Sequence, residues 1–376
     1  DGDGWGTEEL DLGDLPGGSE RASMGGGYYV APNVGMPLTT RWSRESRLAA
    51  DHAAAGSFES AMQLLQRQFG LARLEPLRGA FLALAASSQS VLAPAPSLPS
   101  LQAPLTRPGG WPCVCISLGS LVEKLKAAYG LVTGGKFAEA LDAFKSIMGS
   151  IALALALSRQ QVAELKELLG ICREYITGLR LELLRRTLGA DEKVRACELA
   201  AYFTHCNLQP AHMILALRSA MNISWKAKLK RSAAAFARRL LELNPKPEFA
   251  QTARKVIQAC ESDLTDDFTM ARAPAAIHSC PRSPPLPSDL DSPPPSRPCA
   301  SRPLLPQAYD ERNPFVVCNK SFVPIYRGSE IAYSSFCRAP YLPKFKGAVC
   351  EVDGIGQVGG EGTGFSEVDA DGKFLS

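Results

Sequence analysis

The feature that most constrains the fold of this chain is a helical repeat of apolar residues within residues 197–243. One stripe recurs at the spacing i, i+3, i+4, i+7 and i+8, and its members are Ala233, Phe236, Ala237, Leu240 and Leu241. Because an α-helix has about 3.6 residues per turn, this spacing puts all five side chains on one face. The segment therefore predicts an amphipathic helix that needs a neighbour to cover its apolar face.

Proline-containing breaks divide this region into short helices. Residues 207–210 precede an apolar segment at 212–221, and residues 244–247 follow the stripe. Proline cannot donate the next hydrogen bond of a helix, but it suits the first helical turn. Short breaks of this kind predict helices that pack antiparallel to their neighbours in the chain.

Two further segments have the pattern of helical hairpins. In each, a glycine turn joins two runs of apolar residues, and Gly-x-Phe-x-x-Ala occurs at residues 56–61 and 135–140. The apolar positions are Phe58, Ala61, Met62, Leu65 and Phe69 in the first, and Leu118, Leu121, Leu125, Tyr129, Phe137, Ala140, Leu141, Phe144, Ile147 and Met148 in the second. Stacked hairpins predict a mainly α-helical, TPR-like solenoid, in which each hairpin buries its face against the next.

One apolar series between these hairpins and the C-terminal helices has steps of three and four. Its members are Val162, Leu165, Leu169, Cys172, Ile176 and Leu179. This spacing is typical of a narrow seam that faces a single helix. A coiled-coil dimer is the alternative, but the series covers few heptads, so we expect packing inside the solenoid.

Low-complexity segments mark the domain boundaries. Residues 1–27 are acidic and rich in glycine, residues 87–117 are a proline-rich connection, and residues 263–308 contain a Pro/Ser/Arg block. Such compositions bury too little apolar surface to offset the entropy of ordering. We expect a linker, a long connection and a disordered insertion; a docking site for SH3 or WW domains and a gene-model artefact are the alternatives for the insertion.

Two folded parts remain, a helical domain at residues 28–262 and a small module at residues 309–352. The module alternates β-branched and aromatic residues between glycine and proline breaks, so we expect it to be β-rich. Residues 353–376 are again acidic and rich in glycine, and we expect a flexible tail.

Composition excludes several classes of protein. The hydrophobic content of 45% is enough for a sizeable core, and a net charge of +3 is too small to favour nucleic-acid binding. The eleven cysteines form no regular framework, which favours a reducing compartment. Apolar runs such as residues 151–157 are too short to cross a bilayer, which needs about 20 residues. The chain begins at Asp1 without methionine, so we expect a piece of a longer protein.

Three segments carry a resemblance to a known family: ICREYITGLRLELLRR, CELAAYFTHCNLQPAHMILALR and FARRLLELNPKPEFAQTARK. They resemble the C-terminal domain of the coatomer alpha-subunit (alpha-COP) family, and the resemblance covers most of residues 28–350. It implies a structural, non-enzymatic part of the COPI coat that docks the epsilon coatomer subunit and acts in Golgi-to-ER and intra-Golgi transport. It also implies peripheral membrane association through other coatomer subunits, and no cofactor. A generic TPR-like adaptor of another cytosolic complex is the alternative.

The resemblance also suggests a metal site, because the C-terminal module of relatives resembles a zinc ribbon with a Cys-Pro-x-Cys knuckle. Here Cys318, Cys337 and Cys350 are present, but the first knuckle position is Ser334. Structural zinc needs four ligands, and Asp353 is a conceivable fourth. We expect no bound zinc; a zinc site is the alternative.

Two glycine motifs match nucleotide-binding patterns only in part. Residues 130–136 read GxxxxGK, but Phe137 stands where Ser or Thr would hold magnesium, so we expect a helical turn. Residues 354–359 read GxGxxG, but no helix and second strand can follow, so we expect a disordered tail.

Other candidate sites are equally weak. His205 and Cys206 are adjacent and would diverge on a helix, so they cannot form a catalytic pair. The basic cluster at residues 225–231 predicts a solvated helix junction, with lipid or nucleic-acid contact as the alternative. The sequence thus predicts no catalytic or cofactor-binding residues.

Overall fold

The computed structural model describes most of the two folded parts. The described residues are 40, 43–44, 46–90, 101–102, 116–154, 156, 158–261, 266, 309 and 313–365. The expected linker at 1–27 lies outside them, as do most of the connection at 87–117 and, apart from residue 266, the insertion up to residue 308. Within the connection, strands β1 (Gln89–Ser90) and β2 (Leu101–Gln102) pair antiparallel.

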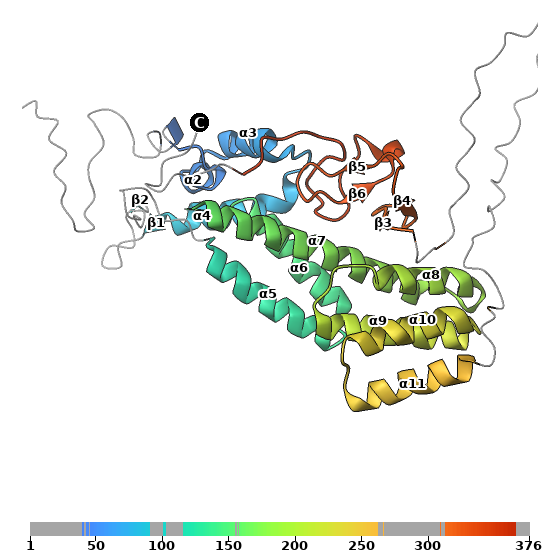
Figure 1. Cartoon of the computed structure of the whole chain (residues 1–376). Coiled ribbons are helices and arrows are strands. Elements are labelled where there is room, and N and C mark those ends of the chain that lie inside the picture. The colour runs from blue at the N-terminus through green and yellow to red at the C-terminus, as the bar shows by residue number, and fades with distance from the viewer. Residues whose placement is uncertain are drawn as a thin grey trace, which may run out of the picture.

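The described chain is a helical solenoid followed by a small β-containing module, as the sequence predicts (Figure 1). The helices are α2 (Ala49–Ala54), α3 (Phe58–Phe69), α4 (Arg78–Ser87), α5 (Leu118–Thr133), α6 (Phe137–Ile151), α7 (Arg159–Thr187), α8 (Lys193–Phe203), α9 (Pro210–Lys226), α10 (Lys230–Glu242) and α11 (Pro247–Glu261). The 3-10 turns are η1 (Glu75–Leu77), η2 (Ala190–Glu192) and η3 (Pro343–Phe345). From α5 to α11, each helix packs against the next one in the chain.

The two predicted glycine turns have the same hydrogen bonds. Gly56 and Gly135 adopt φ angles of +79° and +74°, which are left-handed values that suit glycine. In each turn, the next residue donates its N–H to the carbonyl five positions earlier, which ends the helix in a Schellman motif. Ala61 and Ala140, five residues after each glycine, are fully buried. The Gly-x-Phe-x-x-Ala repeat is therefore the sequence of one hairpin turn used twice.

A third turn of this type joins α9 to α10 without a glycine. Lys228 has φ of +60°, and the N–H of Leu229 donates to the carbonyl of Ser224 in the same pattern. Ala233 is buried at the position that corresponds to Ala61 and Ala140. The hairpin turn thus occurs at three places in the described part of the chain, and two of these copies carry the glycine.

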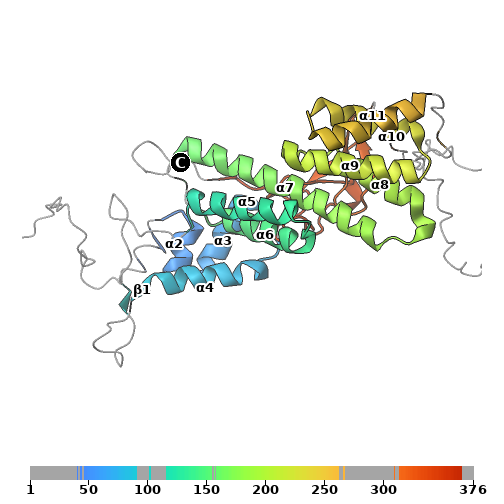
Figure 2. The same ribbon diagram turned by 90° about the horizontal axis from the view of Figure 1, so that it is seen from below.

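Helix α7 lies at the centre of the molecule (Figure 2). The six residues of the predicted seam are all buried, but so are Gly178 and Leu181, which lie on other faces of the helix. Helices α6 and α8 both pack against α7, and the C-terminal module contacts it as well. The expectation of a narrow seam for one facing helix is therefore wrong, because α7 is enclosed on several sides within the chain.

A polar network ties α7 to the hairpins beside it. The hydroxyl of Tyr175 lies 2.7 Å from Nδ1 of His212 in α9 and accepts the N–H of Gln209 at 3.0 Å. Nε2 of His212 lies 3.0 Å from Oγ1 of Thr133 in α5. Burial lowers the pKa of His212 below its ordinary value, so this imidazole stays neutral at neutral pH.

The C-terminal module is built from short antiparallel strands. Strand β3 (Phe315–Val317) pairs with β4 (Pro324–Tyr326), and β5 (Ala332–Tyr333) pairs with β6 (Pro340–Tyr341). The module lies along α7 and reaches α3, near the start of the described chain (Figure 1).

Residues 353–365 belong to this module, so the expectation of a flexible tail from residue 353 is wrong for them. Ile355 and Val358 are buried, and the carbonyl of Ile355 accepts the N–H groups of Ala72 and Arg73 at 2.8 and 3.0 Å. The ring of Phe365 packs edge-on against Phe69, with the centroids 4.9 Å apart. Backbone pairing and a few apolar side chains hold this glycine-rich stretch; residues 366–376 lie outside the described chain.

Gly178 provides a test of how closely α7 and α8 pack. A Cβ atom at Gly178 would lie 2.6 Å from Cε2 of Phe203, whereas a Cβ at Gly170 in the same helix would meet nothing within 4 Å. We expect Gly178→Ala to lower the free energy of unfolding by about 1–3 kcal/mol through overpacking. Gly170→Ala should instead raise it by up to about 1 kcal/mol through helix propensity. Urea denaturation of both variants checks this, and stabilisation by both would contradict the close packing.

Candidate functional site

The module is formed from three hairpins whose tight loops share one design. The loops begin at Cys318, Ser334 and Cys350, at a spacing of 16 residues. In each, the carbonyl of the first residue accepts the N–H of the residue four positions later, at 2.9, 3.2 and 2.9 Å. These later residues are Phe322, Arg338 and Gly354, and all three have positive φ angles. We call these loops the first, second and third knuckles.

The hydrogen bond that closes each hairpin is also repeated. The first residue of each knuckle donates its N–H to a backbone carbonyl on the next strand: Cys318 to Val323, Ser334 to Ala339, and Cys350 to Gly356. The third hairpin has one additional residue, so its pairing is Val349 with Gln357, whereas the second pairs Tyr333 with Pro340. In the sequence, the 16-residue period is marked only by the short segments FVVC, IAYS and GAVC, which share too few residues to predict three equivalent loops.

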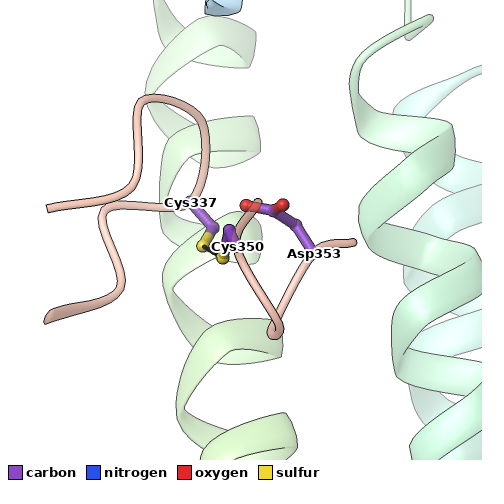
Figure 3. Close-up of side chains that lie close together, drawn as sticks. All are labelled: Cys337, Cys350 and Asp353. Carbon is purple, nitrogen blue, oxygen red and sulfur yellow. Dashed lines mark hydrogen bonds between the residues drawn. The ribbon is translucent and has the colours of Figure 1, made fainter. Parts of the chain in front are cut away.

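The second and third knuckles face each other and bring two thiols together (Figure 3). Sγ of Cys337 lies 3.6 Å from Sγ of Cys350, and both side chains are buried. A carboxylate oxygen of Asp353 lies within 4.8 Å of both sulfur atoms. Among the described residues, this group is the one set of at least three Cys, His, Asp or Glu side chains close enough to hold a metal ion.

The fourth side chain of this cluster is Ser334. Its hydroxyl donates to Oδ2 of Asp353 at 3.0 Å. The other carboxylate oxygen, Oδ1, accepts the N–H groups of Ile355 and Gly356 at 2.9 and 2.8 Å. Both oxygens of the buried Asp353 therefore have hydrogen-bond donors.

The two sulfur atoms are buried and lie near the hydroxyl of Tyr341 and the carboxylate of Asp353. Burial raises the pKa of the Cys337 thiol well above its ordinary value, and the neighbouring Cys350 and Asp353 act in the same direction. The hydroxyl of Tyr341 lies 3.1 Å from Sγ of Cys350 and accepts the N–H of Glu351 at 2.9 Å. Without a metal, Cys337 is a neutral thiol at neutral pH.

Cys318 lies outside the cluster, so the sequence prediction that grouped it with Cys337 and Cys350 is wrong in this part. Its sulfur is buried and accepts the N–H of Leu342 at 3.4 Å. Cys318 is excluded because it begins the first knuckle, whereas the cluster is formed by the second and third knuckles. In those two knuckles, the positions beside the clustered thiols are occupied by Ser334 and Asp353.

The cluster fits a structural zinc ion only in part. Zn–S bonds of about 2.3 Å in a tetrahedron separate two thiolates by about 3.8 Å, close to the observed 3.6 Å. The remaining corners do not fit, because Ser334 is a neutral hydroxyl and its proton is donated to Asp353. Structural zinc sites use four cysteine or histidine ligands, and this set has two. The residues present therefore do not form such a site, and the absence of bound zinc remains a prediction.

The first knuckle binds the helices instead. Thr177 of α7 lies 2.7 Å from the side-chain oxygen of the buried Asn319. Arg180 donates to the carbonyl of Asn319 at 2.8 Å and to Glu351 at 2.6 Å, while Arg195 of α8 donates to the carbonyl of Phe322 at 2.9 Å. These contacts fix the module to α7 and α8, and no sequence motif indicated them.

The GxxxxGK motif is a helical turn, as predicted. Gly130 lies in the last turn of α5, Gly135 is the left-handed residue of the hairpin turn, and α6 begins at Phe137. Lys136 pairs with Glu139 at 3.2 Å. A phosphate-binding loop would need a strand before it, which this motif lacks.

The GxGxxG motif lies in the third knuckle and its strand, so the expectation that it is disordered is wrong. Gly356 pairs with Leu71, and Val358 pairs with Ser334. No helix follows it within the described residues up to 365, so it does not have the geometry of a dinucleotide site.

His205 and Cys206 do not form a pair, as expected, although they follow α8 instead of lying on it. Cys206 is buried with its sulfur 3.8 Å from the carbonyl of Tyr202, whereas His205 is exposed and lies 3.0 Å from the hydroxyl of Tyr309.

The basic cluster at 225–231 is the junction of α9 and α10. Leu229 within it is fully buried, and the N–H of Arg231 donates to Asp266 at 2.9 Å. Trp225 is 42% exposed.

Two hollows among the described residues are small. A cavity lined by α2, α3, Ala152, Leu153 and Phe365 has a volume of about 30 Å³, and an open depression at Arg159 and Lys166 has about 210 Å³. Small-molecule sites usually have about 300–1,000 Å³. None of the helices described is both long and apolar enough to cross a membrane.

Comparison with known proteins decides the family. The family model for the C-terminus of the coatomer (COPI) alpha subunit matches residues 1–276 and 305–371. The chain belongs to this coatomer alpha family. The unmatched gap falls in the Pro/Ser/Arg block, and the match extends beyond residues 28–350, the range in which the sequence showed the resemblance, at both ends.

Curated relatives agree with this match. Coatomer subunit alpha of Dictyostelium discoideum is 41% identical over 88% of the chain, and coatomer subunit alpha-1 of Arabidopsis thaliana is 40% identical over 96%. Coatomer subunit alpha of Saccharomyces cerevisiae is 30% identical over 69%. The chain spans about a quarter of the length of these coatomer alpha subunits, with 25%, 27% and 22% of each covered.

Arg180 provides a test of how the module is attached in this coatomer domain. Arg180→Ala removes the donors to Asn319 and Glu351, and we expect it to lower the free energy of unfolding by about 2 kcal/mol, because the carbonyl of Asn319 loses a charged donor. Arg238→Ala, at an exposed position of α10, is the control and should change it by less than about 0.5 kcal/mol. Equal effects in denaturant titrations would show that Arg180 does not hold the module.

Proposed function

We propose that this chain is a structural part of the COPI vesicle coat and that it docks the epsilon coatomer subunit. The observation that carries the proposal is the family match, which spans the helical solenoid and the module together. The proposed role includes Golgi-to-ER and intra-Golgi transport. In this role the chain is cytoplasmic and associates with the Golgi membrane through the other coatomer subunits.

A non-enzymatic role agrees with the described part of the chain. The thiol cluster is buried, the two nucleotide-like motifs are a helical turn and a strand, and the cavities noted above are small. We therefore propose that the chain acts by binding other proteins. Helical solenoids are suited to this role, because they offer extended surfaces to their partners.

The solvent-facing side of α9 is the surface we propose for the epsilon subunit. Leu215, Arg218, Asn222 and Trp225 recur at helical spacing and are all exposed. Leu215 and Trp225 are 39% and 42% exposed, although apolar side chains of this size are usually buried in a monomer. Tryptophan and arginine side chains are among the types that most often dominate the binding energy of protein interfaces, and Leu215 adds apolar area beside them.

The surface continues from α9 onto α11. The guanidinium of Arg218 lies over the ring of Phe249, 4.3 Å from its centroid. This cation–π contact holds Arg218 flat beside the apolar residues of α9, so less side-chain entropy is lost when a partner binds. The proposed surface thus combines two apolar anchors with one ordered positive charge.

Co-expression with an epsilon coatomer subunit tests the assignment to the coat. We expect a one-to-one complex that survives size-exclusion chromatography. If the chain failed to co-elute with epsilon and bound an unrelated helical protein instead, a generic adaptor would replace the coat subunit as the function.

Leu215→Asp tests the proposed surface. We expect the change to weaken epsilon binding by about 30-fold, or about 2 kcal/mol, as loss of an interface anchor does. The matched control is Leu82→Asp, because Leu82 is 52% exposed but lies on α4, away from this surface. Titration calorimetry measures the affinity of each variant for the epsilon subunit. Equal affinities of the two variants would exclude the α9 surface as the docking site and would leave the coat assignment intact.

A further inference from the structure

The facing knuckles place four side chains at the positions of a zinc-ribbon site. They are the first and fourth residues of two consecutive loops: Ser334 and Cys337, then Cys350 and Asp353. We propose that the cluster has the backbone architecture of a two-knuckle metal site but holds no metal, because the Ser334–Asp353 hydrogen bond takes the place of two metal ligands and lets the module fold without one. The inference does not depend on the proposed role in the coat.

The arrangement of the four side chains supports this inference. The two thiols are 3.6 Å apart, and the two oxygen atoms of the other pair are 3.0 Å apart. Each pair contains one side chain from each knuckle, so both pairs cross between the loops. A metal ion at the centre would make the same two cross-links, and here a hydrogen bond and a sulfur contact make them.

The backbone around Asp353 also has the conformation expected at a metal-ligand position of a knuckle. Its Oδ1 accepts the N–H groups two and three residues later, from Ile355 and Gly356. Side chains that bind a metal commonly accept or donate hydrogen bonds to surrounding groups, which fix their orientation. A cysteine thiolate at position 353 would face the same two backbone N–H groups. Asp353 therefore keeps the loop in the ligand-holding conformation.

The first knuckle offers an internal comparison. It has the same backbone hydrogen bonds, with Cys318 first and Ser321 fourth, but it faces α7 and α8 instead of another knuckle. Oγ of Ser321 is buried and has no hydrogen-bond partner among the described residues. One knuckle contributes only two ligand positions, its first and fourth residues, so this loop cannot form a four-ligand metal site by itself.

The test is to restore the two ligands. The double variant Ser334→Cys, Asp353→Cys should purify with about one zinc per chain, as four thiolates at these corners form a structural site. The wild-type chain should contain none, and a chelator should lower the melting temperature of the double variant but not that of the wild type. The control is Ser321→Cys, which makes a Cys-x-x-Cys sequence in the first knuckle and should bind no stoichiometric zinc.

A second variant keeps the inference testable if the double variant does not fold. Asp353→Cys alone gives three thiols, and titration with Co²⁺ should produce the absorption of tetrahedral thiolate coordination. One zinc per wild-type chain, lost in Cys337→Ser, would overturn the inference, because the existing residues would then hold the metal. Folded double and single variants that bind neither zinc nor cobalt would overturn it as well, because the four positions would not form a site.

Discussion

The burial of α7 on several sides is the constraint on which the rest of the structure depends. The helix is 29 residues long, and its inner residues contact α6 on one side and α8 on another. Phe144 of α6 stacks on Tyr175 with the ring centroids 4.8 Å apart, and Gly178 admits the ring of Phe203 at the end of α8. A third side of α7 carries Thr177 and Arg180, which bind the first knuckle. The helical hairpins and the module therefore share one support.

The module illustrates how a small domain with very short strands is held in place. Its strands have only two or three residues each, and a short isolated hairpin is at best marginally stable. Three additional interactions compensate: the knuckle hydrogen bonds, the buried pairs between the second and third knuckles, and the contacts with α7 and α3. The same backbone turn thus has two uses, because the first knuckle binds the helices whereas the second and third knuckles bind each other.

The sequence predicted the features that rest on side-chain type and failed where backbone geometry decides. The hairpins at Gly56 and Gly135 were predicted, because glycine and apolar spacing mark them, but Lys228 makes the same turn without the marker. Residues 353–365 were expected to be flexible, since their order depends on backbone pairing with Ala72 and Arg73, which lie far away in the chain. Cys318 was assigned to the metal-like cluster because residue type alone cannot show which knuckle faces which.

Native-state hydrogen exchange tests most directly whether α7 supports both parts. We expect amides in the knuckles, such as those of Phe322 and Gly354, to exchange with the same free energy of opening as the central amides of α7, because the module and the helix open together. Knuckle amides that exchanged through a separate opening of much lower free energy, with α7 still protected, would contradict it.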